Sequence, residues 1–204
     1  MSRVVMINHL TLDGVMQAPG RPDEDRRGGF AHGGWAQPNT DEVMGRTLGA
    51  SMAGGPLLLG RRTYEDFYGW WPHQQDNPFT PVLDAARKYV ASRTLKEPLP
   101  WQNSVLLEGD AADAVARLKK EDGLDLLVMG SGVLAESLRR RGLVDEYILM
   151  IHPLVLGRGR RLFADGDTSS LTLVKSVPTT TGVIIATYRV SDSATPQAIA
   201  PHGA

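Results

Sequence analysis

Apolar residues recur along the chain in eight short runs that are rich in Val, Ile, Leu and Tyr and end at glycine, proline or a polar cluster. Several runs, such as LLLG, SVLLEG and LDLLVMG, are apolar almost throughout, which is typical of strands buried on both faces of a parallel sheet. The pattern predicts eight strands, at residues 3–9, 56–60, 87–92, 104–108, 124–130, 144–154, 171–177 and 183–190.

Between these strands the apolar positions take helical spacing, which predicts helices at 41–53, 110–120 and 132–141, with a further helical pattern after Thr63. Thr40 and Asp110 stand where N-cap residues belong, and Gly142 stands at the C′ position of the third helix. After residue 144 no helical pattern remains, so the last three strands have to pair through antiparallel returns. We expect an α/β fold with a mixed sheet and an antiparallel C-terminal edge.

A long segment without periodicity, residues 10–39, follows the first strand and is rich in Gly, Pro and charged residues. Loops of this length in a compact domain are more often functional than incidental. The length of 204 residues fits one domain, which we place at 1–190, and the Ala-, Ser-, Thr- and Pro-rich residues 191–204 are expected to form a flexible tail.

Charge and cysteine content exclude several classes of protein. The chain carries 22 Lys and Arg against 23 Asp and Glu, so no overall field attracts it to nucleic acid or to an anionic membrane. It contains no cysteine, which excludes disulfides, thiol chemistry and cysteine-ligated zinc. The histidines show no metal-ligand spacing, and no apolar run suits a membrane span or a signal peptide. We expect a cytoplasmic protein without metal, and we interpret the arginines of residues 157–161 as a solvated turn.

Three predicted strand ends carry groups that can hold phosphate, because backbone N–H groups at a helix N-terminus and guanidinium groups both bind anions. The three sets are Gly60, Arg61, Arg62 and Thr63; Ser92 and Arg93; and Gly130, Ser131 and Gly132. Each has an ordinary alternative. In the first set Thr63 would cap the helix and the arginines would be solvated, the second set would be a strand end in water, and the third would be a plain strand-to-helix turn.

The long first loop offers groups for a substrate pocket. Asp13 and Gly14 form a turn pair, whose aspartate most often bonds its own backbone. Trp35 and Asp41 could supply an aromatic wall and a carboxylate at the mouth of a pocket, or equally a core tryptophan and an acid at a helix N-terminus.

Taken together, the first strand with its long loop, GRRTYE at 60–65, SRT at 92–94 and GSG at 130–132 resemble the dihydrofolate-reductase-like superfamily. Within it the chain resembles the reductase domain of riboflavin biosynthesis, the C-terminal domain of RibD, through TLDG at 11–14 and the segment 142–159. The resemblance covers residues 3–190. It implies a three-layer fold with an eight-stranded mixed sheet, an NADPH-dependent reductase and a homodimer.

The resemblance also implies roles for individual residues. Cofactor contacts would come from Gly14, Gly60, Arg61, Arg62, Thr63, Ser92, Arg93, Gly130, Ser131, Gly132 and Val133, with Ser92 and Arg93 at the 2′-phosphate. The substrate would meet Thr11, Trp35 and Met129. Because hydride transfer also requires a proton, we hypothesise that Asp13 or Asp41 supports protonation, directly or through water.

Two departures from the family bear on the substrate. The family usually has Glu before its glycine pair, where this chain has Met129, and there is no cysteine for the zinc of the deaminase half of RibD. We therefore expect hydride transfer from NADPH to a heterocyclic or small carbonyl or imine substrate, resembling reduction of 5-amino-6-(5-phosphoribosylamino)uracil. A dihydrofolate or pterin reductase, a reductase that uses a flavin or deazaflavin, and a nucleotide-binding sensor without catalysis are the alternatives.

Overall fold

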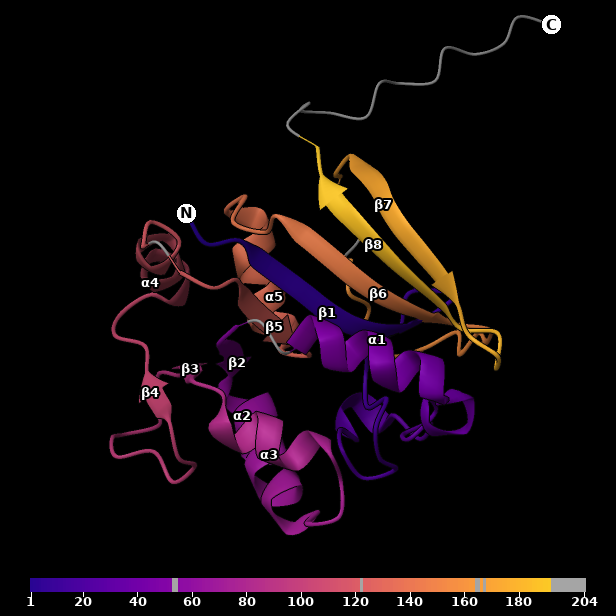
Figure 1. The fold of residues 1–204 in the computed structure, drawn as a ribbon, viewed down its shortest axis with the longest axis horizontal. Coiled ribbons are helices and arrows are strands. Elements are labelled where there is room, and N and C mark those ends of the chain that lie inside the picture. Colours follow the sequence, from indigo (N-terminus) through magenta and orange to yellow (C-terminus); the bar gives the residue numbers. More distant parts are fainter. Residues whose placement is uncertain (53–54, 122, 164–165, 167, 192–204) are drawn as a thin grey trace, which may run out of the picture.

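Eight strands form one sheet in the order β4-β3-β2-β5-β1-β6-β8-β7 (Figure 1). The computed structural model describes residues 1–52, 55–121, 123–163, 166 and 168–191. The strands are β1 (Val4–Thr11), β2 (Leu57–Gly60), β3 (Lys88–Ala91), β4 (Ser104–Leu106), β5 (Leu126–Met129), β6 (Glu146–His152), β7 (Leu171–Pro178) and β8 (Ile184–Val190). All eight predicted strands are therefore confirmed, with shifts of a few residues at their ends.

The sheet is mixed, as the pattern predicted. β1 pairs in parallel with both β5 and β6. The pairs β2–β5, β2–β3 and β3–β4 are also parallel. β8 pairs antiparallel with β6 and β7, which makes the C-terminal edge antiparallel. The prediction that the apolar run of β4 is buried on both faces is wrong. β4 is only half-buried, because it lies at the edge of the sheet.

Helices cover both faces of this sheet and give three layers (Figure 1). The α-helices are α1 (Glu42–Met52), α2 (Arg61–Trp70), α3 (Phe79–Ala85), α4 (Ala111–Leu118) and α5 (Gly132–Arg140). The 3-10 helices are η1 (Arg27–Gly29), η2 (Gln37–Asn39) and η3 (Trp71–His73). Alternate residues of β1 face opposite cores: Val4 and Met6 pack with α4 and α5, while Val5 and Ile7 pack with α1, α2 and α3.

The helix ends follow the predicted chemistry with one correction. Asp110 caps α4 by accepting two N–H groups of its first turn. Gly142, at φ +62°, ends α5, and the N–H of Leu143 bonds the Leu138 carbonyl at 3.0 Å, as in a Schellman motif. Thr40 does not cap α1; Asp41 does, because its carboxylate accepts the Met44 N–H at 2.8 Å. α3 and the 3-10 helices were not predicted.

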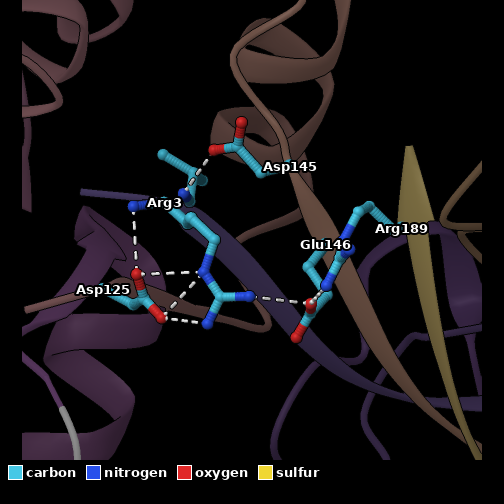
Figure 2. Close-up of polar contacts among 6 residues, drawn as sticks. Arg3, Asp125, Asp145, Glu146 and Arg189 are labelled. Carbon is cyan, nitrogen blue, oxygen red and sulfur yellow. Dashed lines mark hydrogen bonds and ion pairs between the residues drawn. The ribbon is translucent and has the colours of Figure 1, made fainter. Parts of the chain in front are cut away.

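A polar cluster holds the strand ends at the amino edge of the sheet (Figure 2). The Arg3 guanidinium binds both carboxylate oxygens of Asp125, before β5, and Glu146 at the start of β6. The Asp145 carboxylate accepts the Val4 N–H at 2.7 Å, and Arg189 of β8 lies 3.8 Å from Glu146. These contacts tie β1, β5, β6 and β8 together at the end opposite the carboxyl ends of β1, β2 and β5.

Among the described residues, no helix is long and apolar enough to cross a membrane, and no group of three or more His, Asp or Glu side chains could hold a metal ion. Of the expected flexible tail, only Ser191 belongs to the described part of the chain, and its N–H bonds the Ser170 carbonyl. Residues 192–204 lie outside the described residues.

Candidate active site

Two of the predicted phosphate-binding turns meet directly at the carboxyl edge of the sheet. β2 and β5 are neighbouring parallel strands, so the turns into α2 and α5 lie side by side. The Ser131 hydroxyl accepts the Gly60 N–H at 2.9 Å, and the Thr63 hydroxyl accepts the Ser131 N–H at 3.0 Å. Thr63 therefore links the two turns, instead of capping α2 as the ordinary alternative had it.

The turn between β5 and α5 has backbone conformations that favour glycine. Gly130 and Ser131 both lie in the left-handed region, at φ +54°. A Cβ on Gly132 would lie 3.0 Å from Arg160 Cδ and 3.5 Å from Met16 Sδ. The first N–H groups of α2 and α5 have no partner within their helices, so both helix N-termini present donors at this edge. Together the two turns form one cradle, and such an arrangement of donors is typical of anion-binding sites.

A cavity of about 890 Å³ opens beside this cradle. Its floor comes from the ends of β1 and β5, its walls from α1 and α2, and its cover from the long first loop. Predicted site residues that line it are Asp41, Arg62, Thr63, Met129, Gly130, Ser131 and Gly132. Its apolar walls are Met44, Leu48, Phe67, Trp70, Trp71 and Phe79. The lining also carries many charged side chains, among them Arg21, Asp25, Arg27 and Asp66, so the cavity offers both apolar and polar contacts to a small molecule.

Three arginines at this cavity have no ion-pair partner among the described residues. One is Arg26 of the long loop, whose Nε donates to the Pro22 carbonyl at 3.5 Å. The others are Arg62, in the first turn of α2, and Arg160, which also lines a second cavity of about 370 Å³ at the start of α5. By contrast, Arg61 pairs with Glu65 at 3.0 Å and Arg21 pairs with Asp66. Of the three, Arg62 and Arg160 stand beside the joined turns, because Arg62 lies in the first turn of α2 and Arg160 Cδ lies close to Gly132.

Thr11 and Asp13, in the turn that follows β1, make hydrogen bonds that stabilise the start of the long first loop. The Thr11 hydroxyl donates to Asp13 at 2.6 Å, and Asp13 also accepts the N–H groups of Leu156 and Gly157. The hydrogen bond from Thr11 is the main reason that the pKa of Asp13 lies below its ordinary value. Neither these residues nor Gly14 line the large cavity. The backbone that Asp13 bonds therefore belongs to a segment distant in sequence, and Asp13 joins the first loop to residues 156–157.

Asp41 combines both of its expected alternatives, whereas Trp35 is a core tryptophan. Asp41 lines the cavity, yet its carboxylate caps α1 and accepts the N–H and hydroxyl of Thr180. The Thr180 hydroxyl is the first cause of a lowered Asp41 pKa. Trp35 is buried, donates its indole N–H to the Gln17 carbonyl, and does not line the cavity.

Other predicted residues stand at the same edge but outside the large cavity. Ser92 and Arg93 follow β3, the parallel neighbour of β2, and the Ser92 hydroxyl accepts the N–H groups of Thr94 and Leu95. Val133 is exposed and lines the smaller cavity. Gly60 and Arg61 belong to the cradle without lining the large cavity.

Sequence reasoning missed several groups at the cavity. The turn at 157–161 is more than a solvated turn, because Arg160 reaches the cavity and Arg158 bonds the Gly28 carbonyl. Glu24 of the long loop also lines the cavity, and burial raises its pKa. His9 lines the floor and contacts His152. The two histidines are 143 residues apart, so no local pattern could have revealed their contact.

Comparisons with known proteins agree with this architecture. A family model described as the RibD C-terminal domain matches residues 3–185. "Uncharacterized protein YyaP" of Bacillus subtilis (strain 168) is 31% identical over 138 residues, which cover 65% of this chain and 72% of that protein. "Uncharacterized protein YwjB" of the same organism is 30% identical over 108 residues, or 52% and 57% of the two chains.

Two solved structures share the fold. A "Putative riboflavin biosynthesis protein" from Shewanella sp. PV-4 has a TM-score of 0.67 at 22% identity and aligns with 94% of this chain and 99% of its own. A "pyrimidine reductase-like protein" from Corynebacterium diphtheriae has a TM-score of 0.60 at 13% identity, over 94% and 93% of the two chains. At these identities the likeness concerns the fold alone.

Proposed function

Because the chain belongs to the RibD C-terminal domain family, we propose that it is an NADPH-dependent reductase that transfers hydride to a heterocyclic or small carbonyl or imine substrate. The observation that carries this proposal is the contact between the turns after β2 and β5, beside a cavity large enough for a nicotinamide and a planar substrate. The nearest known chemistry is the reduction of 5-amino-6-(5-phosphoribosylamino)uracil. A homodimer remains a prediction.

The residues of the cradle fit the phosphates of NADPH. The glycine backbone at 130 and 132 allows close approach, the helix N-termini present unpaired N–H groups, and Arg62 supplies a cation without a partner among the described residues. In this proposal Arg61 and Thr63 complete the phosphate site. Ser92 and Arg93, after the next parallel strand, would hold the 2′-phosphate.

A buried polar atom with no hydrogen-bond partner among the described residues also supports ligand binding in the cavity. Asn8 lines the cavity, and its Nδ2 is buried without a hydrogen-bond partner in the described part of the chain. Such an atom is costly unless a ligand or water satisfies it. Bound NADPH would supply the hydride, while the chain orients the reactants and excludes water from the apolar walls.

The reaction also consumes a proton, and the candidate carboxyl groups differ in their ability to supply it. The lowered pKa values of Asp13 and Asp41 mean that both carboxyl groups are ionised near neutral pH, so neither holds a proton to donate. Burial raises the pKa of Glu24, whose Oε2 accepts the Gly20 N–H at 2.6 Å. We propose Glu24 as the more suitable acid. Unchanged turnover in an Asp41→Asn variant would show that Asp41 takes no part in the reaction.

The test is NADPH oxidation, followed by absorbance, in the presence of pyrimidine, pterin and small carbonyl compounds. Oxidation that depends on one of these compounds supports the proposal and identifies the substrate class. Tight NADPH binding without oxidation by any compound supports the sensor alternative. A coloured purified protein would instead indicate a flavin or deazaflavin.

A further inference from the structure

Two histidines make a direct contact at the floor of the cavity. His9 belongs to β1 and His152 ends β6, the parallel neighbour of β1. His9 Nδ1 lies 2.9 Å from His152 Nε2. His152 is fully buried, and the Trp35 ring packs edge-on against it at 5.2 Å. His9 is half-buried and lines the cavity.

The surroundings of His152 determine which nitrogen of each ring carries the proton. His152 Nδ1 is buried and has no hydrogen-bond partner among the described residues. A proton on that atom would leave a buried N–H group unpaired, which proteins rarely tolerate. His152 therefore carries its proton on Nε2 and donates it to His9 Nδ1.

With Nδ1 accepting a hydrogen bond, a neutral His9 carries its own proton on Nε2. Burial, with a further contribution from His152, lowers the pKa of His9 to about 3, so the ring is neutral at physiological pH. Within the described residues the His9 ring hydrogen-bonds only through Nδ1, to His152, and His9 lines the cavity, so the Nε2–H group is available to a ligand.

His9 lies on the strand next to β5, which leads into the cradle. On β1, Ile7 is two residues before His9 and pairs with Met129 of β5, next to Gly130. Residues two apart on a strand share a face, so His9 and Ile7 lie on the same side of the sheet. His9 is thus a polar side chain next to the apolar Ile7, Met129 and Met150 on the floor of the cavity.

We propose that His9 donates its Nε2–H to the heteroatom of the reacting C=O or C=N group, and that His152 is the positioning residue that fixes this tautomer. The proposal rests on the proposed reductase function. In the balanced step, hydride joins the carbon, the π pair moves to the heteroatom, and a proton from an acid or water completes the product. His9 keeps its proton throughout and stabilises the charge that develops on the heteroatom.

A consequence for substrate class follows from a neutral donor at this place. The reacting heteroatom must present a free lone pair, as a ketone, lactam carbonyl or neutral imine does. A protonated iminium has no lone pair and only donates hydrogen bonds, so His9 would select against it. This geometry favours neutral carbonyl and imine acceptors.

The first experiment needs neither substrate nor cofactor. Long-range nitrogen–proton NMR spectra of the ¹⁵N-histidine-labelled full chain, assigned with His9→Gln and His152→Gln, report the tautomer of each ring. We expect His9 and His152 both protonated on Nε2 at neutral pH. A His9 ring protonated on Nδ1, or a charged ring, would overturn the proposal. In His152→Leu the His9 signal should lose its fixed tautomer.

The second experiment separates this proposal from the proposed function. His9→Leu should lower kcat by about 10²- to 10³-fold while NADPH affinity stays within about twofold, as expected for the loss of one oxyanion donor. His9→Gln keeps a donor and should recover most of that loss, and His73→Gln, at an exposed site, is the matched control. Unchanged kcat in His9→Leu would refute the role of His9. Absence of NADPH binding in the wild type would instead refute the proposed function and leave the tautomer result valid.

Discussion

Acid should destabilise this protein through the buried histidine pair. Burial lowers the pKa of His9 to about 3 and that of His152 to about 4, whereas an unfolded histidine titrates near its ordinary value of about 6.5. Between these values the unfolded chain binds more protons than the folded chain, so the free energy of unfolding falls as the pH falls. The loss begins as the pH drops through about 6.5 and continues towards the folded pKa values.

The size of the effect at pH 5 depends mainly on the unfolded value, because both folded rings are still largely neutral there. One pKa unit corresponds to about 1.4 kcal/mol, so each histidine costs about 2 kcal/mol at pH 5 and the pair about 4 kcal/mol. This is a large share of the roughly 5 to 15 kcal/mol that stabilises a typical domain. The aspartates with lowered pKa values titrate mostly below pH 5 and contribute little in this window.

Urea denaturation at pH 7.5 and pH 5 measures the difference for the wild type and for the His9→Gln, His152→Gln double variant. We expect the double variant to lose most of the pH dependence, whatever its stability at pH 7.5. The raised pKa of Glu24 acts in the opposite direction but is common to both proteins. The His73→Gln control should behave like the wild type. Equal pH dependence in the wild type and the double variant would refute neutral burial of the pair.

Three further predictions concern stability and can be checked by urea denaturation at neutral pH. Lys88→Met should cost at least about 2 kcal/mol, because the fully buried Nζ donates to three backbone carbonyls that would lose their partner; a smaller loss would mean that water replaces it. Asp110→Ala should cost about 1 kcal/mol through loss of the α4 cap, and no change would mean that the cap is dispensable. Gly159→Ala should cost more than about 2 kcal/mol, because its Cβ would lie 2.6 Å from Val15 at φ +126°. Gly157→Ala, with positive φ but open space, should cost less, and equal losses would contradict the steric argument.

The elements with strong local signals were predictable from the sequence. The apolar runs gave all eight strands, and Asp110 and Gly142 marked helix ends that the structure has. α3 was missed because it is only seven residues long and contains a proline, which left too little apolar periodicity to recognise. The cap of α1 was misplaced by one residue because threonine and aspartate are both good caps and stand side by side at 40 and 41.

The site was predictable where strand ends carry recognisable turns and not where it depends on contacts distant in sequence. The Gly60 and Gly130 turns could be identified because glycine and serine follow buried strands. That Thr63 joins them by bonding Ser131 depends on the strand order, which local patterns do not contain. The position of Arg160 at the cavity could not be predicted either, because it also depends on packing between segments distant in sequence.

The central claim is that NADPH binds at the two joined turns, and calorimetric titration with NADPH and NADH tests it most directly. We predict that the wild type prefers NADPH, and that Arg62→Ala combined with Arg93→Ala weakens NADPH binding by at least about tenfold and removes the preference, because charge-assisted hydrogen bonds are worth about 1.5 to 3 kcal/mol each. Arg140→Ala, an exposed arginine paired with Glu136, should leave both affinities unchanged. No NADPH binding by the wild type, or a preference that survives the double substitution, would contradict the account.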